Sequence, residues 1–113
     1  MKRYEMIKDK KYFNSIIRQG KYSKDKNFVI YYINNKSGAS KFGIAIKKSI
    51  GSAVDRNRLK RQTRAIIDDN RKIFKKSYDY IIMIRDGCST SSYKEMNDSI
   101  INNMKGILKW RKN

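Results

Sequence analysis

Apolar side chains recur along this chain with two different periods, which predict helices and strands in alternation. Between Lys8 and Gln19 they recur at the spacing of one helix face, and Asp9 and Gly20 stand where such a helix would begin and end. The side chains on this face are Phe13, Ile16 and Ile17. We therefore predict a first helix over residues 8–19.

Two segments rich in β-branched and aromatic residues, 26–34 and 41–48, are predicted to be strands. A short strand around 21–23 is expected before them. The segment 26–34 is apolar on both faces, because alternation puts Phe28, Ile30 and Tyr32 on one side and Val29, Tyr31 and Ile33 on the other. Either both faces are covered, or one packs in the core and the other binds a partner.

The polar turn between these two strands favours a hairpin in which they pair directly. The second strand carries the small residues Gly43 and Ala45 between bulky neighbours. In such a hairpin the small residues would lie beside Tyr31 and leave space above the sheet.

Two capping signals mark the starts of two further helices. Ser52 with Asp55, and Ser92 with Glu95, have the spacing at which each side chain bonds the backbone of the other residue. The first of these helices would end near residue 69 and the second near residue 110, with a strand at 78–86 between them. The last helix is expected to bury Met96, Ile100, Met104 and Leu108, and to use Trp110 as a packing anchor.

The order of these elements is helix, three strands, helix, strand, helix. It predicts an α+β fold, a two-layer α/β sandwich of order αβββαβα. A chain of 113 residues can bury one modest core, so we expect a single domain over residues 1–113. General rules for chain connections favour a right-handed crossover in any parallel βαβ unit.

The net charge of the chain points to its class of partner. There are 28 basic residues against 10 acidic ones, which gives a net charge of +18. Such a charge destabilises the folded chain through self-repulsion, so a polyanionic partner is its natural explanation. Aromatic residues make up 12% of the chain, which argues against a disordered basic tail.

Composition excludes several classes of chemistry. The absence of histidine excludes imidazole catalysis and histidine-ligated metal sites. The lone Cys88 can form neither an internal disulfide nor a cysteine zinc cluster, which fits the cytoplasm, where we expect the protein to act. No apolar run approaches the roughly 18 residues of a membrane span, so no membrane partner is expected.

The segment AVDRNRLKRQTR, residues 53–64, contains five cationic side chains and one acidic one. On a helix, Arg56, Lys60 and Arg64 would stack on one side, with Asn57 and Arg61 beside them. Like charges four residues apart are mildly destabilising, so a one-sided stripe favours contact with RNA or DNA. The alternative is an ordinary solvated helix face in a lysine-rich chain.

The longer stretch GIAIKKSIGSAVDRNRLKRQTR, residues 43–64, closely resembles the RNR motif region of the bacterial ribonuclease P protein component. The matching positions are Gly43, Lys48, Gly51, Ala53, Val54, Arg56, Asn57, Arg58, Lys60, Arg61 and Arg64. Two positions differ, since Lys47 stands where Ser or Thr is usual and Ser49 where a second basic residue is common.

The resemblance extends upstream to YFNSIIRQG, residues 12–20, and FVIYY, residues 28–32. Tyr12 replaces an acidic residue of the family pattern, and Ile17 stands where an aromatic residue is often found. The resemblance implies a cleft, lined by Phe13, Ile17, Val29 and Tyr31, that holds the 5′ leader of precursor tRNA. Simple core packing is the other explanation for these apolar side chains.

The resemblance also implies an assembly in which this chain is the non-catalytic subunit of a ribonucleoprotein endonuclease. The catalytic RNA subunit would hydrolyse precursor tRNA with Mg²⁺ held mainly by RNA, and the family fold has a left-handed crossover. Contact with the catalytic RNA is expected at Lys47, Lys48, Arg56, Asn57, Arg58, Lys60, Arg61 and Arg64. No catalytic residue, no protein-bound metal and no DNA partner are expected.

Two other functions share some of these features. A structural RNA-binding protein of the ribosomal type would have the same charge, but it would have no need of a leader cleft. A nuclease made of protein alone would need carboxylates that converge on Mg²⁺. The acidic residues Asp68, Asp69, Asp79 and Asp86 lie at helix and strand ends without convergent spacing, which disfavours the nuclease.

Overall fold

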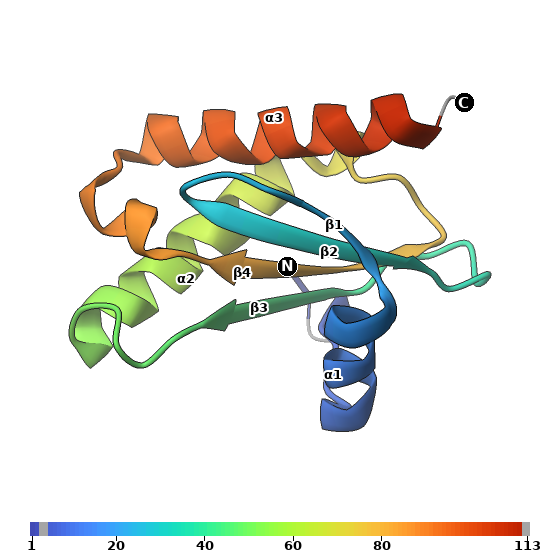
Figure 1. Ribbon diagram of the computed structural model, residues 1–113, viewed down its shortest axis with the longest axis horizontal. Helices are drawn as coiled ribbons and strands as arrows, with labels where there is room; N and C mark the ends of the chain where they lie inside the picture. The colour runs from blue at the N-terminus through green and yellow to red at the C-terminus, as the bar shows by residue number, and fades with distance from the viewer. Residues whose placement is uncertain (3–4, 112–113) are drawn as a thin grey trace.

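The computed structural model describes residues 1–2 and 5–111, with side chains up to residue 108. The main elements are α1 (Lys10–Gln19), β1 (Lys21–Lys24), β2 (Phe28–Asn34), β3 (Phe42–Ile46), α2 (Ala53–Asp69), β4 (Tyr78–Ile84) and α3 (Tyr93–Arg111). Short 3-10 turns, η2 (Arg71–Ile73) and η3 (Asp86–Thr90), flank β4. The predicted order of elements is confirmed (Figure 1). The predicted anchor Trp110 has a side chain outside the described part.

The helix starts form at the capping signals in the sequence. Asp9 accepts a hydrogen bond from the backbone N–H of Lys11, 2.9 Å away, at the start of α1. The capping boxes of α2 and α3 both form, because Ser52 and Ser92 each exchange hydrogen bonds with the acidic residue three positions on. These contacts span only a few residues, so the local sequence is enough to position them.

The strands form one sheet in the order β1-β2-β4-β3. β2 is antiparallel to both β1 and β4, whereas β3 runs parallel to β4. The predicted hairpin between β2 and β3 is therefore wrong, because β4 lies between them. Ile81 and Ile82 of β4 are fully buried, one on each face of the sheet. The backbone of β4 is therefore shielded from water, and its N–H and C=O groups need hydrogen-bond partners in a strand along each edge.

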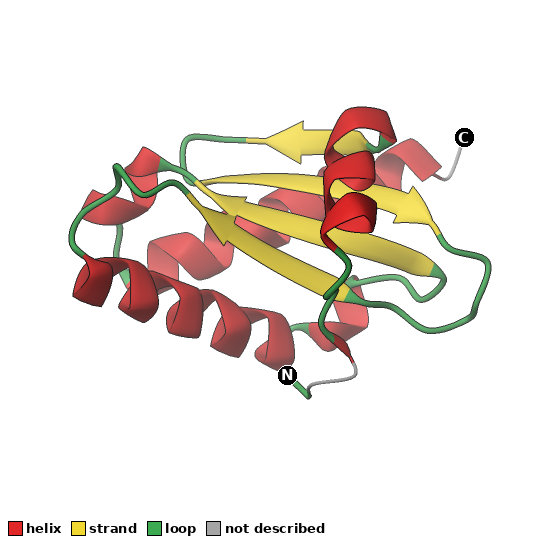
Figure 2. Ribbon diagram, turned by 90° about the horizontal axis from the view of Figure 1, so that it is seen from below, coloured by secondary structure: helices red, strands yellow, loops and turns green. Residues whose placement is uncertain are grey.

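The connection from β3 through α2 to β4 is left-handed, as the family resemblance implies. In Figure 1 both strands point left, β4 lies above β3, and α2 passes behind the sheet. Figure 2 shows the sheet between α1 on one side and α2 on the other. This connection departs from the right-handed rule for parallel βαβ units.

The main core lies between one sheet face and the helices α2 and α3. Phe28 and Ile30 of β2 and Ile82 of β4 are fully buried there. From α3, Met96, Ile100 and Met104 are fully buried as predicted, but Ile107 occupies the last core position and Leu108 is only half-buried. The other sheet face carries Val29 and Tyr31, and α1 covers only part of it.

Candidate RNA-binding surfaces

The cations of α2 face outward because its apolar side chains pack on the sheet. Leu59, Ile66 and Ile67 are buried on the inner side of the helix. On the outer side, an open groove of about 470 Å³ is lined by Val54, Asn57, Lys60, Arg61 and Arg64. We call this surface the basic groove. Its three cations and one amide form a continuous strip along the helix.

Arg56 does not line the basic groove, although it was predicted in the same stripe. Its guanidinium group turns back and donates hydrogen bonds to the carbonyl oxygens of Lys48 and Gly51, at 2.8 and 2.9 Å. Gly51 has a φ of +59°, a conformation that glycine adopts readily. Arg56 therefore braces the loop that leads into α2.

Asn57 and Arg58 remain available to a partner. Asn57 is exposed, and its side chain makes no hydrogen bond to any described residue. Arg58 lies 3.7 Å from Asp55, with both side chains about half exposed, so this ion pair contributes little to stability. The pKa of the Asp55 carboxyl is lowered chiefly by hydrogen bonds from the backbone and side chain of Ser52.

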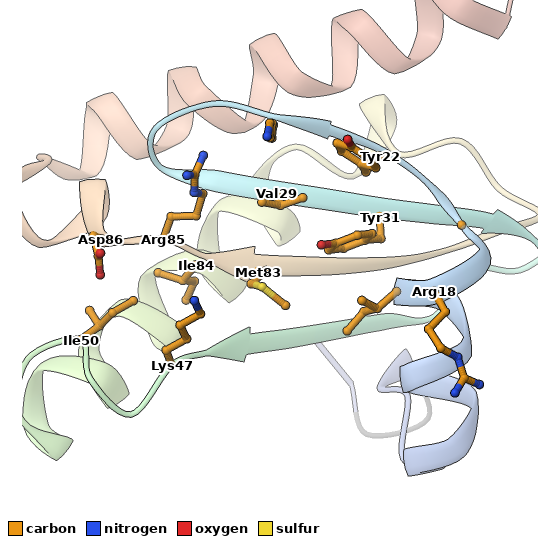
Figure 3. Close-up of a pocket in the computed structure, with 13 residues that line it drawn as sticks. Arg18, Tyr22, Val29, Tyr31, Lys47, Ile50, Met83, Ile84, Arg85 and Asp86 are labelled. Carbon is orange, nitrogen blue, oxygen red and sulfur yellow. The ribbon is translucent and has the colours of Figure 1, made fainter.

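A second hollow, with a volume of about 520 Å³, lies on the sheet face that α1 leaves open (Figure 3). We call it the cleft. Tyr22, Val29, Tyr31 and Met83 project from neighbouring strands along its floor, and Ile17 of α1 forms part of one wall. Four cations also line it: Arg18, Lys24, Lys47 and Arg85. Apolar and aromatic surface with a cationic border is suited to single-stranded nucleic acid.

Three of the four predicted cleft residues, Ile17, Val29 and Tyr31, line this hollow, and Phe13 does not. The ring of Phe13 packs over Gly43 instead, where an added Cβ atom would lie 2.5 Å from the Phe13 Cε2 atom. The space expected above Gly43 is therefore filled by α1. Ile81 also separates Gly43 from Tyr31 in the sheet, so the two are not neighbours.

One known protein family matches nearly the whole chain. The family model for ribonuclease P matches residues 1–108. The chain is 36% identical over 110 residues to the ribonuclease P protein component of Mesoplasma florum, covering 93% of this chain and 100% of that protein. The chain belongs to the ribonuclease P protein family.

Solved structures agree with this assignment. The RNase P protein from Thermotoga maritima is 27% identical with a TM-score of 0.81, over 89% of this chain and 96% of that one. A mutant of the Staphylococcus aureus RNase P protein with defective mRNA degradation activity is 28% identical, also with a TM-score of 0.81, over 94% of this chain and 89% of that one. The α+β fold of the family is thus confirmed, and its members are protein components of an endoribonuclease.

In this ribonuclease P family member, the motif residues Lys47 and Lys48 lie between the two surfaces. Lys47 lines the end of the cleft, together with Arg85 and Asp86 (Figure 3). Lys48 is the next residue, and its carbonyl oxygen is held by Arg56. The cleft therefore ends at the loop that leads into α2.

Tyr22, Lys24, Met83 and Arg85 are cleft residues that the sequence pattern did not predict. Their positions depend on strand pairing, since Tyr22 lies opposite Tyr31, Lys24 opposite Val29, and Met83 on the far side of Val29. Alternation in β1 and β4 would have identified these side chains only if both strands had been placed beside β2. The predicted hairpin put β3 in the position of β4.

Tyr12, which replaces an acidic residue of the family pattern, fastens α1 to the sheet. Its hydroxyl donates to Asp79 Oδ2 at 2.5 Å. The other oxygen of this buried carboxylate accepts from the Asn35 side chain at 2.6 Å and the Lys41 backbone N–H at 2.9 Å. Burial, followed by the nearby Asp79 carboxylate, raises the pKa of Tyr12 to about 12.

Cys88 and the acidic side chains, which were the other candidates for a reactive or metal-binding site, form no such site among the described residues. Cys88 is buried, its thiol donates to the Asn27 carbonyl oxygen at 3.1 Å, and burial raises its pKa to about 12. A neutral buried thiol of this kind is a poor nucleophile. Within residues 1–2 and 5–108, no three acidic or cysteine side chains gather as metal ligands would. Among the described helices, none has the length and apolar character needed to cross a bilayer.

Proposed function

We propose that this chain is the protein subunit of ribonuclease P, which binds the catalytic RNA through the basic groove and the 5′ leader of precursor tRNA through the cleft. One observation carries this proposal. The cleft and the basic groove are joined by the loop at residues 47–51, which Arg56 holds in place. An RNA docked on the groove would therefore lie next to a strand held in the cleft.

The chemistry of the two surfaces supports binding rather than hydrolysis. Guanidinium and ammonium groups bind phosphate oxygens, and aromatic rings stack on bases. Both surfaces are mainly cationic or apolar, and the cleft offers a single carboxylate, Asp86. These residues do not fit a Mg²⁺ site, which needs several oxygen ligands. We infer that the RNA subunit holds Mg²⁺ and performs the cleavage.

Reconstitution tests this division of labour. Precursor tRNA with a long leader is incubated with the protein alone, the catalytic RNA alone, and both together at low Mg²⁺. We expect no cleavage by the protein alone, and faster cleavage by the mixture than by RNA alone because the protein raises substrate affinity. Cleavage by the protein alone, or no stimulation in the mixture, would refute the proposal.

One alternative is favoured by a specific comparison. The Staphylococcus aureus relative has a mutant with defective mRNA degradation activity, which raises RNA degradation as a second candidate function here. The reconstitution should therefore include an unstructured mRNA incubated with the protein alone. Degradation that persists after repurification, and that disappears in a cleft or groove variant, would favour this function.

A structural RNA binder remains the other alternative, and the cleft distinguishes it from a leader-binding subunit. Tyr31→Val should weaken binding of a long-leader precursor and leave binding of mature tRNA unchanged, because only the precursor carries bases that can occupy the cleft. An equal loss for both RNAs would place the leader elsewhere.

A further inference from the structure

β1 supplies a second aromatic ring to the cleft, outside the RNR motif and the family-like cleft positions. Tyr22 is 58% exposed and lines the cleft. It lies directly opposite Tyr31 in the strand pairing, and the ring centroids are 5.8 Å apart with the planes at 49°. Figure 3 shows Tyr22, Val29 and Tyr31 together over this face of the sheet.

We propose that Tyr22 and Tyr31 form a platform on which two neighbouring bases of a single-stranded 5′ leader stack, one on each ring. The inference rests on the proposed function and adds a residue that determines how many leader bases contribute to binding. Because the rings are tilted and close together, a base cannot be sandwiched between them. Each ring instead offers one face to its own base.

The surrounding charges suit the backbone of such a strand. Lys24 lies two residues beyond Tyr22 on the same face of β1, opposite Val29, and Lys47 and Arg85 lie at the same end of the cleft. A strand stacked on the two rings could run along β2 with its phosphates near Lys24 and Lys47. One guanidinium nitrogen of Arg85 donates to the Asp25 carbonyl oxygen at 2.6 Å, so this residue offers only its remaining N–H groups. At the other end, Ile17 of α1 offers no ring for stacking, so β1 provides the second aromatic surface.

An exposed tyrosine on an edge strand has a simpler explanation, since cross-strand aromatic pairs also stabilise sheets. The test must therefore separate stacking on RNA from support of the fold. Tyr22→Val removes the ring but keeps a residue that favours strands. Tyr22→Phe keeps the ring. Tyr93→Val is a matched control, because Tyr93 is 40% exposed on α3, across the sheet from the cleft.

Each variant is assembled with the catalytic RNA, and the dissociation constant is measured for two precursors, one with a long leader and one with a single-nucleotide leader. We expect Tyr22→Val to weaken binding of the long-leader precursor by about fivefold or more, as loss of one stacked base does. Tyr22→Phe and Tyr93→Val should remain within about twofold of the wild type. Binding of the short-leader precursor should be unchanged in all variants.

Abasic substitutions placed singly along the leader then locate the bases. One position should weaken binding to the wild type but not to Tyr22→Val, and a neighbouring position should show the same relation to Tyr31→Val. Thermal unfolding checks that each variant is folded. If Tyr22→Val does not fold, Tyr22→Leu replaces it in both measurements.

Three results would overturn the inference. If Tyr31→Val loses long-leader affinity while Tyr22→Val keeps it, the cleft binds the leader without the second ring, and the proposed function stands. If Tyr22→Val weakens both precursors equally, the ring acts through the fold or through the catalytic RNA. If neither tyrosine affects long-leader binding, the leader cleft of the proposed function fails as well.

Discussion

Arg56 and Arg61 are five residues apart in the same cationic segment, yet one guanidinium group binds the protein itself and the other is exposed to a partner. The Arg56 guanidinium is committed to two carbonyl oxygens of its own chain, at Lys48 and Gly51. The Arg61 side chain is exposed in the basic groove and has no hydrogen bond or ion pair to a described residue. Arg56 thus shapes the surface, whereas Arg61 offers its charge to a partner.

Alanine substitution at these two positions should distinguish support of the loop, by Arg56, from direct charge contact with RNA, by Arg61. Arg56→Ala should lower the free energy of unfolding by about 1 kcal/mol, because it removes two hydrogen bonds that a partly exposed side chain donates to carbonyl oxygens. It should also weaken binding to the catalytic RNA. Arg61→Ala should weaken RNA binding without lowering the free energy of unfolding. The stability of both variants is measured by urea unfolding. Equal stability of the two variants would show that Arg56 does not support the loop.

Tyr12 connects α1 to the sheet through the hydrogen bond that its hydroxyl donates to Asp79. Tyr12→Phe removes one hydrogen-bond donor from the buried carboxylate of Asp79, which should cost about 1–3 kcal/mol of unfolding free energy. Because α1 forms a wall of the cleft, long-leader binding should weaken too. Ser15→Ala on α1 is the control, since the Ser15 hydroxyl bonds only within its own helix.

The stabilising effect of Tyr12 should depend on pH. Its folded-state pKa, about 12, lies above the ordinary value of 10.0, so its contribution is fully present below about pH 10 and is lost as pH rises towards 12. The difference in unfolding free energy between wild type and Tyr12→Phe should shrink over that interval. If the difference in unfolding free energy between wild type and Tyr12→Phe stays constant up to pH 12, the pKa of the Tyr12 hydroxyl is not raised by the fold in the way proposed.

At the scale of elements, the features that could be predicted from the sequence are those that depend on residues close together along the chain. Asp9 and the Ser52–Asp55 pair start their helices as expected, because each cap bonds residues within the next turn. The inward side of α2 was also predictable, since the spacing of Leu59 and Ile66 alone defines an apolar face. The direction of the Arg56 side chain was not, because its partners lie in the preceding loop.

The order of the strands could not be read from local pattern. β2 and β3 are close in sequence and joined by a polar turn, but the later β4 is apolar on both faces and takes the central position between them. That insertion decides the cleft: it brings Met83 beside Val29 and leaves Gly43 under Phe13. The wrong pairing of β2 with β3 therefore kept Met83 out of the predicted cleft floor, and Tyr22 was missed separately because β1 had not been placed beside β2.

The contact between α1 and β3 gives a prediction at this scale. Gly43→Ala would place a Cβ atom 2.5 Å from the Phe13 ring, so α1 must shift and stability should fall by about 1–3 kcal/mol. In a Phe13→Leu background the same glycine substitution should cost less, because the narrower side chain leaves room. A double-mutant cycle by urea unfolding measures this coupling. Additive effects would show that the two residues do not meet.

Over the whole molecule, the cations that make up the net charge of +18 fall into different environments. Some cations are neutralised within the protein, as Arg71 is by Glu5 and Asp68. Others, such as Lys60 and Arg64, line the basic groove, and Lys24 and Arg85 line the cleft. The two surfaces should therefore respond differently to salt, since one depends mainly on charge and the other on charge and stacking.

Salt titration of binding can measure that difference. Replacing Arg61 and Arg64 with Ala should reduce the slope of log Kobs against log salt for the catalytic RNA by about 0.7–0.9 for each phosphate that is no longer neutralised. Tyr31→Val should weaken long-leader binding without changing its slope, because a stacked ring releases no counterions from the RNA. If the arginine substitutions leave the slope unchanged, the groove does not bind phosphates, and the cationic face of α2 is ordinary solvated surface.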